Sequence, residues 1–97
     1  MQQFTPDLFR KVQHQLNLGG LIPSTVICSP KRFTEFQKGV YRETKVIQTI
    51  ERFDDETFFF RYDDVSIEPD RYCKDNLIYF TKDCRVLACF DFEEYRG

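Results

Sequence analysis

The chain has 97 residues and a mass of 11.7 kDa, which is enough for one hydrophobic core and too little for two. Apolar residues make up 41% and charged residues 31% of the chain, a composition that excludes a mainly disordered protein. No stretch approaches the roughly 18 apolar residues of a membrane-spanning helix, and the first residues carry no apolar leader. We therefore expect a single compact domain over residues 1–97, located in the cytoplasm and not in a membrane.

The first predicted element is a helix over residues 6–17. Thr5 is a favourable N-cap residue, and Pro6 suits the first helical position, where a missing N–H costs nothing. Gly19 and Gly20 then end the helix. Its apolar face recurs at helical spacing and consists of Leu8, Phe9, Val12 and Leu16.

The segment 24–28 is rich in β-branched residues and predicts a short strand. Ser29 and Pro30 repeat the N-cap pattern, so we expect a short second helix over 30–38, with Gly39 as its stop. A loop or 3₁₀ turn is the alternative, because two helical turns have little stability on their own.

From residue 40 onward the pattern changes to that of β-strands. Two antiparallel hairpins are expected, one around the polar turn 54–56 and one around residues 81–84. In the second hairpin Val86, Ala88, Phe90 and Phe92 alternate along one predicted face. The predicted strands are 44–53, 57–62, 65–67, 77–80 and 85–92.

These elements predict an α+β domain in which the N-terminal helix, with or without the short second one, packs on an antiparallel sheet of about four to five strands. Unpaired edges of such a sheet, or spare Phe surface, would allow a homodimer. The strand residues expected to meet the helix are Val46, Ile50, Phe58, Phe60, Leu87 or Phe90.

Charge is distributed unevenly along the chain. Residues 1–50 contain seven bases and three acids, a net charge of +4, whereas residues 51–97 contain seven bases and thirteen acids, a net charge of −6. The two halves either interleave in one sheet and pair across strands or form separate charged surfaces. The sequence leaves both arrangements open.

The residues do not form a recognisable catalytic or metal-binding motif. His14 is the single imidazole, and no nucleophile motif accompanies it. The acidic residues of the second half lack calcium-loop spacing and are expected to be solvated turn carboxylates. The cysteines lack zinc-site spacing and are expected to be free, mostly buried thiols; they are Cys28, Cys73, Cys84 and Cys89. We therefore expect no enzyme activity, no metal and no cofactor.

The favoured functional hypothesis is a small acidic protein that binds another protein, such as an inhibitor or accessory protein. Electrostatic complementarity speeds and directs the association of such a protein with a partner that has a basic surface. The segment 54–64 is the expected contact because acids are concentrated there. The predicted partner-binding residues are Asp54, Asp55, Glu56, Asp63 and Asp64.

The alternative hypothesis is nucleic-acid binding by the basic first half. Bases interleaved with Phe33, Phe36 and Tyr41 could hold phosphates and stack nucleobases. The acidic isoelectric point, about 5.4, argues against a dedicated nucleic-acid binder. The residues predicted for this role are Lys31, Arg32, Lys38, Arg42 and Lys45.

Overall fold

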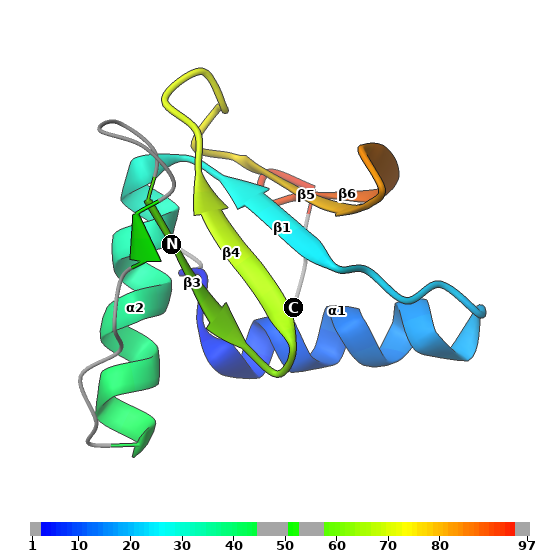
Figure 1. Cartoon of the computed structure of the whole chain (residues 1–97), viewed down its shortest axis with the longest axis horizontal. Coiled ribbons are helices and arrows are strands. Elements are labelled where there is room, and N and C mark those ends of the chain that lie inside the picture. Colours follow the sequence, from blue (N-terminus) through cyan, green and yellow to red (C-terminus); the bar gives the residue numbers. More distant parts are fainter. Residues whose placement is uncertain (1–2, 45–50, 53–57, 95–97) are drawn as a thin grey trace.

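The computed structural model describes residues 3–44, 51–52 and 58–94. Over these residues the chain forms two helices and six strands (Figure 1). In chain order they are α1 (Pro6–Leu18), β1 (Thr25–Cys28), α2 (Pro30–Thr44), β2 (Glu51–Arg52), β3 (Phe58–Tyr62), β4 (Val65–Pro69), β5 (Leu77–Lys82) and β6 (Arg85–Asp91).

The strands form one mixed sheet in the order β2-β3-β4-β1-β5-β6. Neighbouring strands are antiparallel except for β1 and β4, which run in the same direction with Val26 beside Ile67. This parallel pair arises because the connection from β1 to β4 includes α2, which returns the chain to the same end of the sheet. The prediction of an α+β domain with the N-terminal helix packed on the sheet is confirmed. The sheet differs from the expected antiparallel one at the parallel β1–β4 pair.

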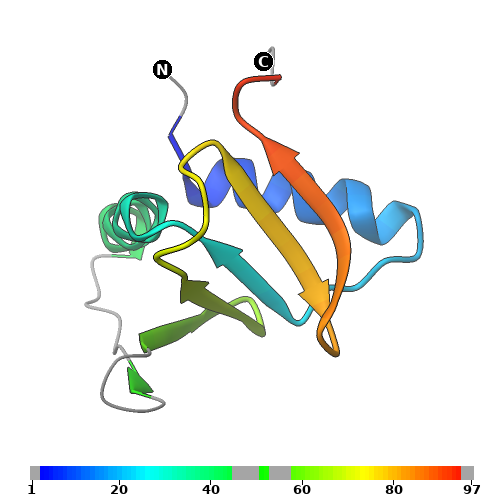
Figure 2. The same ribbon diagram turned by 90° about the horizontal axis from the view of Figure 1, so that it is seen from above.

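Both helices contribute to one core on the same face of the sheet. Figure 2 shows α1 running behind the strands and α2 end-on beside them. Phe60, Ile67, Val26 and Phe80 stand opposite one another on neighbouring strands, and all four are buried. Phe9 of α1 packs on Phe80 with 6.2 Å between ring centroids. The opposite face of the sheet carries no described helix.

The first helix is formed as its sequence predicts. The Thr5 hydroxyl accepts a hydrogen bond from the Leu8 N–H at 3.2 Å, and Pro6 occupies the first turn. The helix ends at Leu18, followed by Gly19 as the C-cap and by Gly20 with a φ of 81°. Only a glycine adopts that left-handed conformation without strain.

The second helix is longer than predicted, because Gly39 does not end it. α2 continues to Thr44, and a Cβ at Gly39 would lie 2.7 Å from the Cδ of Pro6. Glycine therefore permits close packing of α1 on α2. The predicted strand 44–53 is wrong at its first residue, which is helical, while residues 45–50 and 53 lie outside the described part. The two other residues of that predicted strand, Glu51 and Arg52, form β2, which pairs antiparallel with β3.

The predicted alternation along β6 is wrong at Val86. A β-bulge shifts the register between Phe80 and Thr81, so Val86 pairs with Thr81, whereas Ala88 pairs with Phe80. Adjacent residues of a strand point to opposite faces, so Val86 lies on the face away from the helices. It is 61% exposed.

The predicted helix–sheet contacts are confirmed for two of the strand residues. Phe60 belongs to the core, and Phe90 packs against it while partly buried. Val46 and Ile50 lie outside the described residues, as does the side chain of Phe58. Leu87 is half-buried and is not part of the described core. Neither described helix is long and apolar enough to cross a membrane.

Candidate functional site

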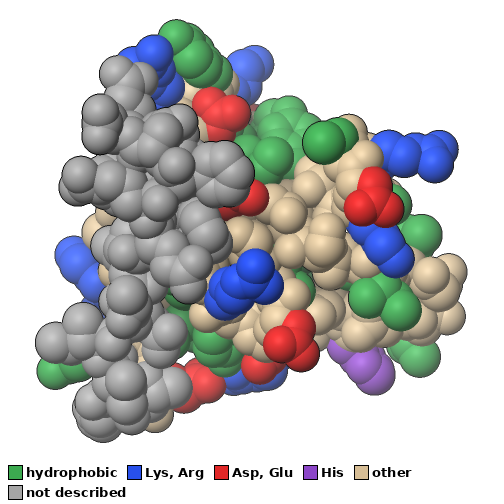
Figure 3. All heavy atoms as spheres, in the orientation of Figure 1, with side chains coloured by type: hydrophobic (Ala, Val, Ile, Leu, Met, Phe, Trp, Pro, Cys, Tyr) green, Lys and Arg blue, Asp and Glu red, His purple; other side chains and the backbone are tan. Residues whose placement is uncertain are grey.

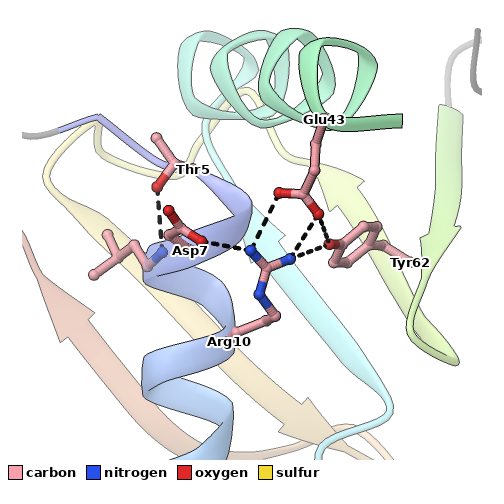
Figure 4. A network of polar contacts seen from close by, with 6 residues as sticks. Thr5, Asp7, Arg10, Glu43 and Tyr62 are labelled. Atoms are coloured by element: carbon pink, nitrogen blue, oxygen red, sulfur yellow. Dashed lines mark hydrogen bonds and ion pairs between the residues drawn. The ribbon is translucent and has the colours of Figure 1, made fainter. Parts of the chain in front are cut away.

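A polar network joins α1, α2 and β3 around the guanidinium of Arg10 (Figure 4). Its Nη1 donates to Glu43 Oε1 at 2.8 Å and to the Tyr62 hydroxyl at 2.6 Å. Its Nη2 donates to Glu43 Oε2 at 3.1 Å and also to Asp7 Oδ1. The Arg10–Glu43 pair is thus bidentate, the geometry that fixes both side chains most strongly.

The core determines where this network forms. The ring of Tyr62 packs edge-on against Phe9 at 5.7 Å and against Phe36 at 5.3 Å. Its hydroxyl therefore projects to the rim of the core, where it donates to Glu43 Oε1 at 3.2 Å. Glu43 reaches this point only because α2 continues past Gly39.

The network keeps its carboxylate ionised. The hydrogen bond from Arg10 lowers the pKa of Glu43 below its usual value, because a donor to the charged form favours ionisation. The same bond, which the Glu43 carboxylate accepts, raises the pKa of Arg10. Burial raises the pKa of the Tyr62 phenol, so the hydroxyl stays protonated at neutral pH.

Four carboxylates gather at this corner of the molecule. The side chain of Asp7 is 80% exposed and that of Glu43 is 43% exposed. Asp63 and Asp64, both exposed, follow Tyr62 directly in the β3–β4 turn. In Figure 3 acidic side chains appear along the lower edge of the molecule, where Figure 1 places this turn and α1. We call Asp7, Glu43, Asp63 and Asp64 the acidic corner.

The β3–β4 turn holds its two carboxylates in a fixed backbone conformation. Asp63 and Asp64 have φ angles of 51° and 64°, and two left-handed residues in succession are typical of a type I′ hairpin turn. The β5–β6 turn is a structural duplicate, with φ angles of 52° at Asp83 and 64° at Cys84. Among the described residues, the ion pairs form at Arg10 and Arg32 and do not involve these turns.

The structure describes only two of the five residues of the acidic contact predicted from the sequence. Asp63 and Asp64 lie together at the surface, whereas Asp54, Asp55 and Glu56 lie outside the described residues. Sequence reasoning missed Asp7 and Glu43. Glu43 could have been found only by extending the predicted second helix to residue 44. Gly39 hid this extension because a glycine usually ends a helix.

Three of the five residues predicted for the alternative basic surface lie together on α2. Lys31, Lys38 and Arg42 are exposed on α2, and their spacing of seven and four residues puts them on one face of the helix. The two acids of α2 are engaged elsewhere, Glu35 with Arg32 and Glu43 with Arg10. Lys45 lies outside the described residues. The outer face of α2 is consequently basic.

Arg32 does not belong to that outer face, contrary to the sequence-based expectation. It is 3% exposed, and its Nη1 donates to Glu35 Oε1 at 2.8 Å while its Nε donates to the Asp75 carbonyl at 2.6 Å. Its guanidinium also lies 3.8 Å from the ring centre of Phe92. Arg32 is thus a structural residue of the interior.

The aromatic residues of the basic segment are also mostly internal. Phe33 and Phe36 are 7% and 0% exposed and pack on Phe60. They cannot stack on nucleobases in this fold. Tyr41, which is 49% exposed, is the aromatic residue that remains beside Lys38 and Arg42.

The cysteines are free thiols, and two of them are more exposed than predicted. Cys28 is buried and Cys73 half-buried, whereas Cys84 and Cys89 are exposed. Cys84 occupies a hairpin turn, and Cys89 lies on the sheet face away from the helices. Burial raises the pKa of Cys28 and of Cys73, which makes their thiols poor nucleophiles.

No group of three or more His, Cys, Asp or Glu side chains in the described part of the chain is arranged to hold a metal ion. His14 is exposed on α1. No protein-family model, curated protein or solved structure matches this chain.

Proposed function

We propose that this chain is a non-enzymatic protein-binding module whose acidic corner docks on a basic surface of a partner protein. The observation that carries the proposal is the convergence of four exposed or half-exposed carboxylates from three separate elements. Arg10 is the base within the network, and its guanidinium is occupied by Asp7 and Glu43. The corner therefore has a net negative charge, which attracts a basic partner.

The rigidity of the corner also supports the proposal. Glu43 is held by hydrogen bonds from Arg10 and Tyr62, and the β3–β4 turn is fixed by paired strands on both sides. Groups that are already positioned lose less conformational entropy on binding. A small inhibitor or accessory protein that recognises a basic surface would use carboxylates in this way.

The test is a pull-down from source-cell lysate with nuclease present, followed by quantitative mass spectrometry. The test bait carries Asp63→Asn and Asp64→Gly, which removes both charges and supplies the Asn-Gly pair that a type I′ turn favours. The matched control carries Asp83→Asn and Cys84→Gly, the same change in the duplicate turn. Both variants should improve their turns, and their melting temperatures verify that a loss of binding does not come from unfolding.

The proposal predicts one stoichiometric protein that is retained by the wild type and by the β5–β6 control and is depleted on the β3–β4 variant. A partner that binds all three baits equally would contradict the assignment of the corner. If nuclease removes every captured protein from the wild-type bait, the protein-binding proposal itself is wrong.

A second candidate function is binding of a nucleic-acid backbone by the outer face of α2. The observation that favours it is the alignment of Lys31, Lys38 and Arg42 on a helix whose two acids are paired elsewhere. A single-stranded oligonucleotide should bind with an affinity that falls steeply with salt, because bound phosphates release counterions. Lys38→Gln with Arg42→Gln should reduce that salt slope, and a flat salt response in the wild type would contradict this candidate.

A further inference from the structure

The loop between β4 and β5 carries a highly exposed aromatic side chain. Tyr72 is 82% exposed, more than any other large apolar side chain in the described part of the chain. The loop is held by its own hydrogen bonds: Asp70 Oδ1 accepts the Tyr72 N–H at 2.8 Å, and the Asp70 carbonyl accepts the Cys73 N–H at 3.0 Å. The Lys74 carbonyl accepts the Leu77 N–H at 3.1 Å. An ordered backbone therefore presents this ring to the solvent.

One face of the ring lies beside a guanidinium group. The Arg71 Cζ is 5.0 Å from the centre of the Tyr72 ring, a distance at which a cation is attracted to an aromatic face. The high exposure of Tyr72 leaves the other face open. A flat ligand can stack there, and nucleobases stack on aromatic rings in this way.

The loop lies against the first turn of α2. Arg32 Nε donates to the Asp75 carbonyl at 2.6 Å, and the Asp70 N–H donates to the Cys28 carbonyl, at the end of β1, at 2.8 Å. Figures 1 and 2 both show the β4–β5 loop beside the start of α2. Lys31 is exposed at this end of the helix. The loop is thus next to the point where the basic outer face of α2 begins.

The helix and the loop differ in charge. Lys31, Lys38 and Arg42 extend over roughly 16 Å of α2 at about 1.5 Å per residue, and none of them belongs to an ion pair within the described residues. The loop, residues 70–76, contains two bases and two acids and has no net charge. Phosphates are therefore attracted to α2, and the aromatic ring is what the loop adds.

We propose that Tyr72 stacks on an unpaired base of a single-stranded nucleic acid whose backbone lies along the outer face of α2. This inference rests on the second candidate function and specifies its ligand as a single strand. A duplex keeps its bases stacked inside and offers none to Tyr72. Proteins also bury exposed tyrosines at interfaces, but the basic helix beside the loop favours a ligand that carries phosphates.

The first test measures affinity by fluorescence anisotropy with labelled oligo(dT) and oligo(U) of about twelve nucleotides. Tyr72→Ala should lower the affinity for each probe about tenfold, because stacking on the ring is lost. It should leave the salt dependence unchanged, because the phosphate contacts remain. Tyr72→Phe keeps the ring and should bind like the wild type.

The second test observes stacking directly. The chain contains no tryptophan, so Tyr72→Trp introduces a single fluorescent reporter. Oligo(dT) should quench its emission at low salt, added salt should reverse the quenching, and a duplex of the same length should leave the emission unchanged. The matched control is Val86→Trp, at a position that is 61% exposed on β6, and its emission should not respond to oligo(dT).

The results separate this inference from the second candidate function. A wild type that binds neither probe, or binds them with a flat salt response, would contradict both. A wild type whose affinity falls steeply with salt, together with equally tight binding by Tyr72→Ala, would overturn the stacking inference alone. Equal responses of the two tryptophan reporters would overturn it as well.

The proposed partner binding at the acidic corner is tested separately. Its variants change the β3–β4 turn, whereas Tyr72 lies in the β4–β5 loop. A Tyr72→Ala bait should therefore capture the same lysate protein as the wild type. Loss of that protein from the bait would show that the ring contacts a protein, and it would overturn the stacking inference.

Discussion

Among the described residues, two arginine–glutamate pairs involve α2, and they differ mainly in burial. In the inner pair the side chains of Arg32 and Glu35 are 4% and 17% exposed, and Glu35 also accepts the Phe4 N–H at 3.0 Å. In the outer pair those of Arg10 and Glu43 are 41% and 43% exposed. The inner pair connects the N-terminal segment, the β4–β5 loop and Phe92. The outer pair leaves its carboxylate accessible to a partner.

The comparison shows that burial, and not the type of residue, decides whether a charged side chain holds the fold together or remains accessible to a partner. A buried ion pair must satisfy its hydrogen-bonding groups inside the protein. No described buried side-chain nitrogen or oxygen lacks a partner. An exposed pair is solvated, so it contributes little stability and keeps its charge available for binding.

The largest predicted effect is at the inner pair. Arg32→Met should reduce the free energy of unfolding by about 3–5 kcal/mol, because it leaves Glu35 without its ionic partner in the interior. Urea denaturation followed by circular dichroism measures this loss. The matched variant Arg32→Lys keeps the charge but not the planar guanidinium that bonds with both Glu35 and the Asp75 carbonyl, and it should fall between wild type and Arg32→Met. An Arg32→Met protein as stable as wild type would show that the inner pair is dispensable.

A smaller effect of opposite sign is expected in the β3–β4 turn, beside the outer pair. Asp63→Asn with Asp64→Gly should stabilise the protein by about 1 kcal/mol, because glycine tolerates the left-handed conformation better than aspartate. The melting temperature of this variant is compared with that of Asp83→Asn with Cys84→Gly, which should rise similarly. A large fall in either variant would mean that its turn carboxylate or thiol has a structural role.

Removal of the outer arginine should have a still smaller effect. Arg10→Met is expected to shift the urea midpoint by roughly one-fifth or less of the shift for Arg32→Met, because solvent screens the exposed pair. The shift should shrink further when salt is added. If Arg10→Met destabilises the protein as much as Arg32→Met, the outer pair is as structural as the inner one.

The smallest effect concerns pH. The pKa of Glu43 is lowered from its usual 4.5 by Arg10, so the folded state releases this proton more readily than the unfolded state. The stabilisation is therefore complete above about pH 4.5 and is lost as pH falls through the lowered pKa. The difference in stability between wild type and Arg10→Met should disappear in acid, and a difference that grows there would contradict the lowered pKa.

The local signals in the sequence predicted much of the fold. Thr5-Pro6 and Gly19-Gly20 predicted α1, and β-branched and aromatic runs predicted the strands. The length of α2 could not be predicted, because the role of Gly39 depends on its contact with Pro6 in another helix. The bulge in β6 likewise depends on pairing with β5. These features come from tertiary packing, which overrides local propensity.

The candidate site was less predictable than the fold. Asp63 and Asp64 were predicted as contact residues without the turn that holds them, and Asp7 and Glu43 join them only through Arg10 and Tyr62. Arg32 was grouped with exposed bases because the sequence does not reveal which charges are buried. The basic and acidic halves of the chain are mixed in space at the corner, where Arg10 and Glu43 of the first half bond with Tyr62 of the second.

The most direct test of the central claim is the association rate of the captured partner with immobilised wild-type protein and with the Asp63→Asn, Asp64→Gly variant. Electrostatic docking at the acidic corner predicts an association rate about tenfold lower for the variant at low salt, with convergence of the two rates at high salt. The Asp83→Asn, Cys84→Gly control should associate at nearly the wild-type rate. Equal association rates for all three proteins at low salt would contradict the claim that the acidic corner guides binding.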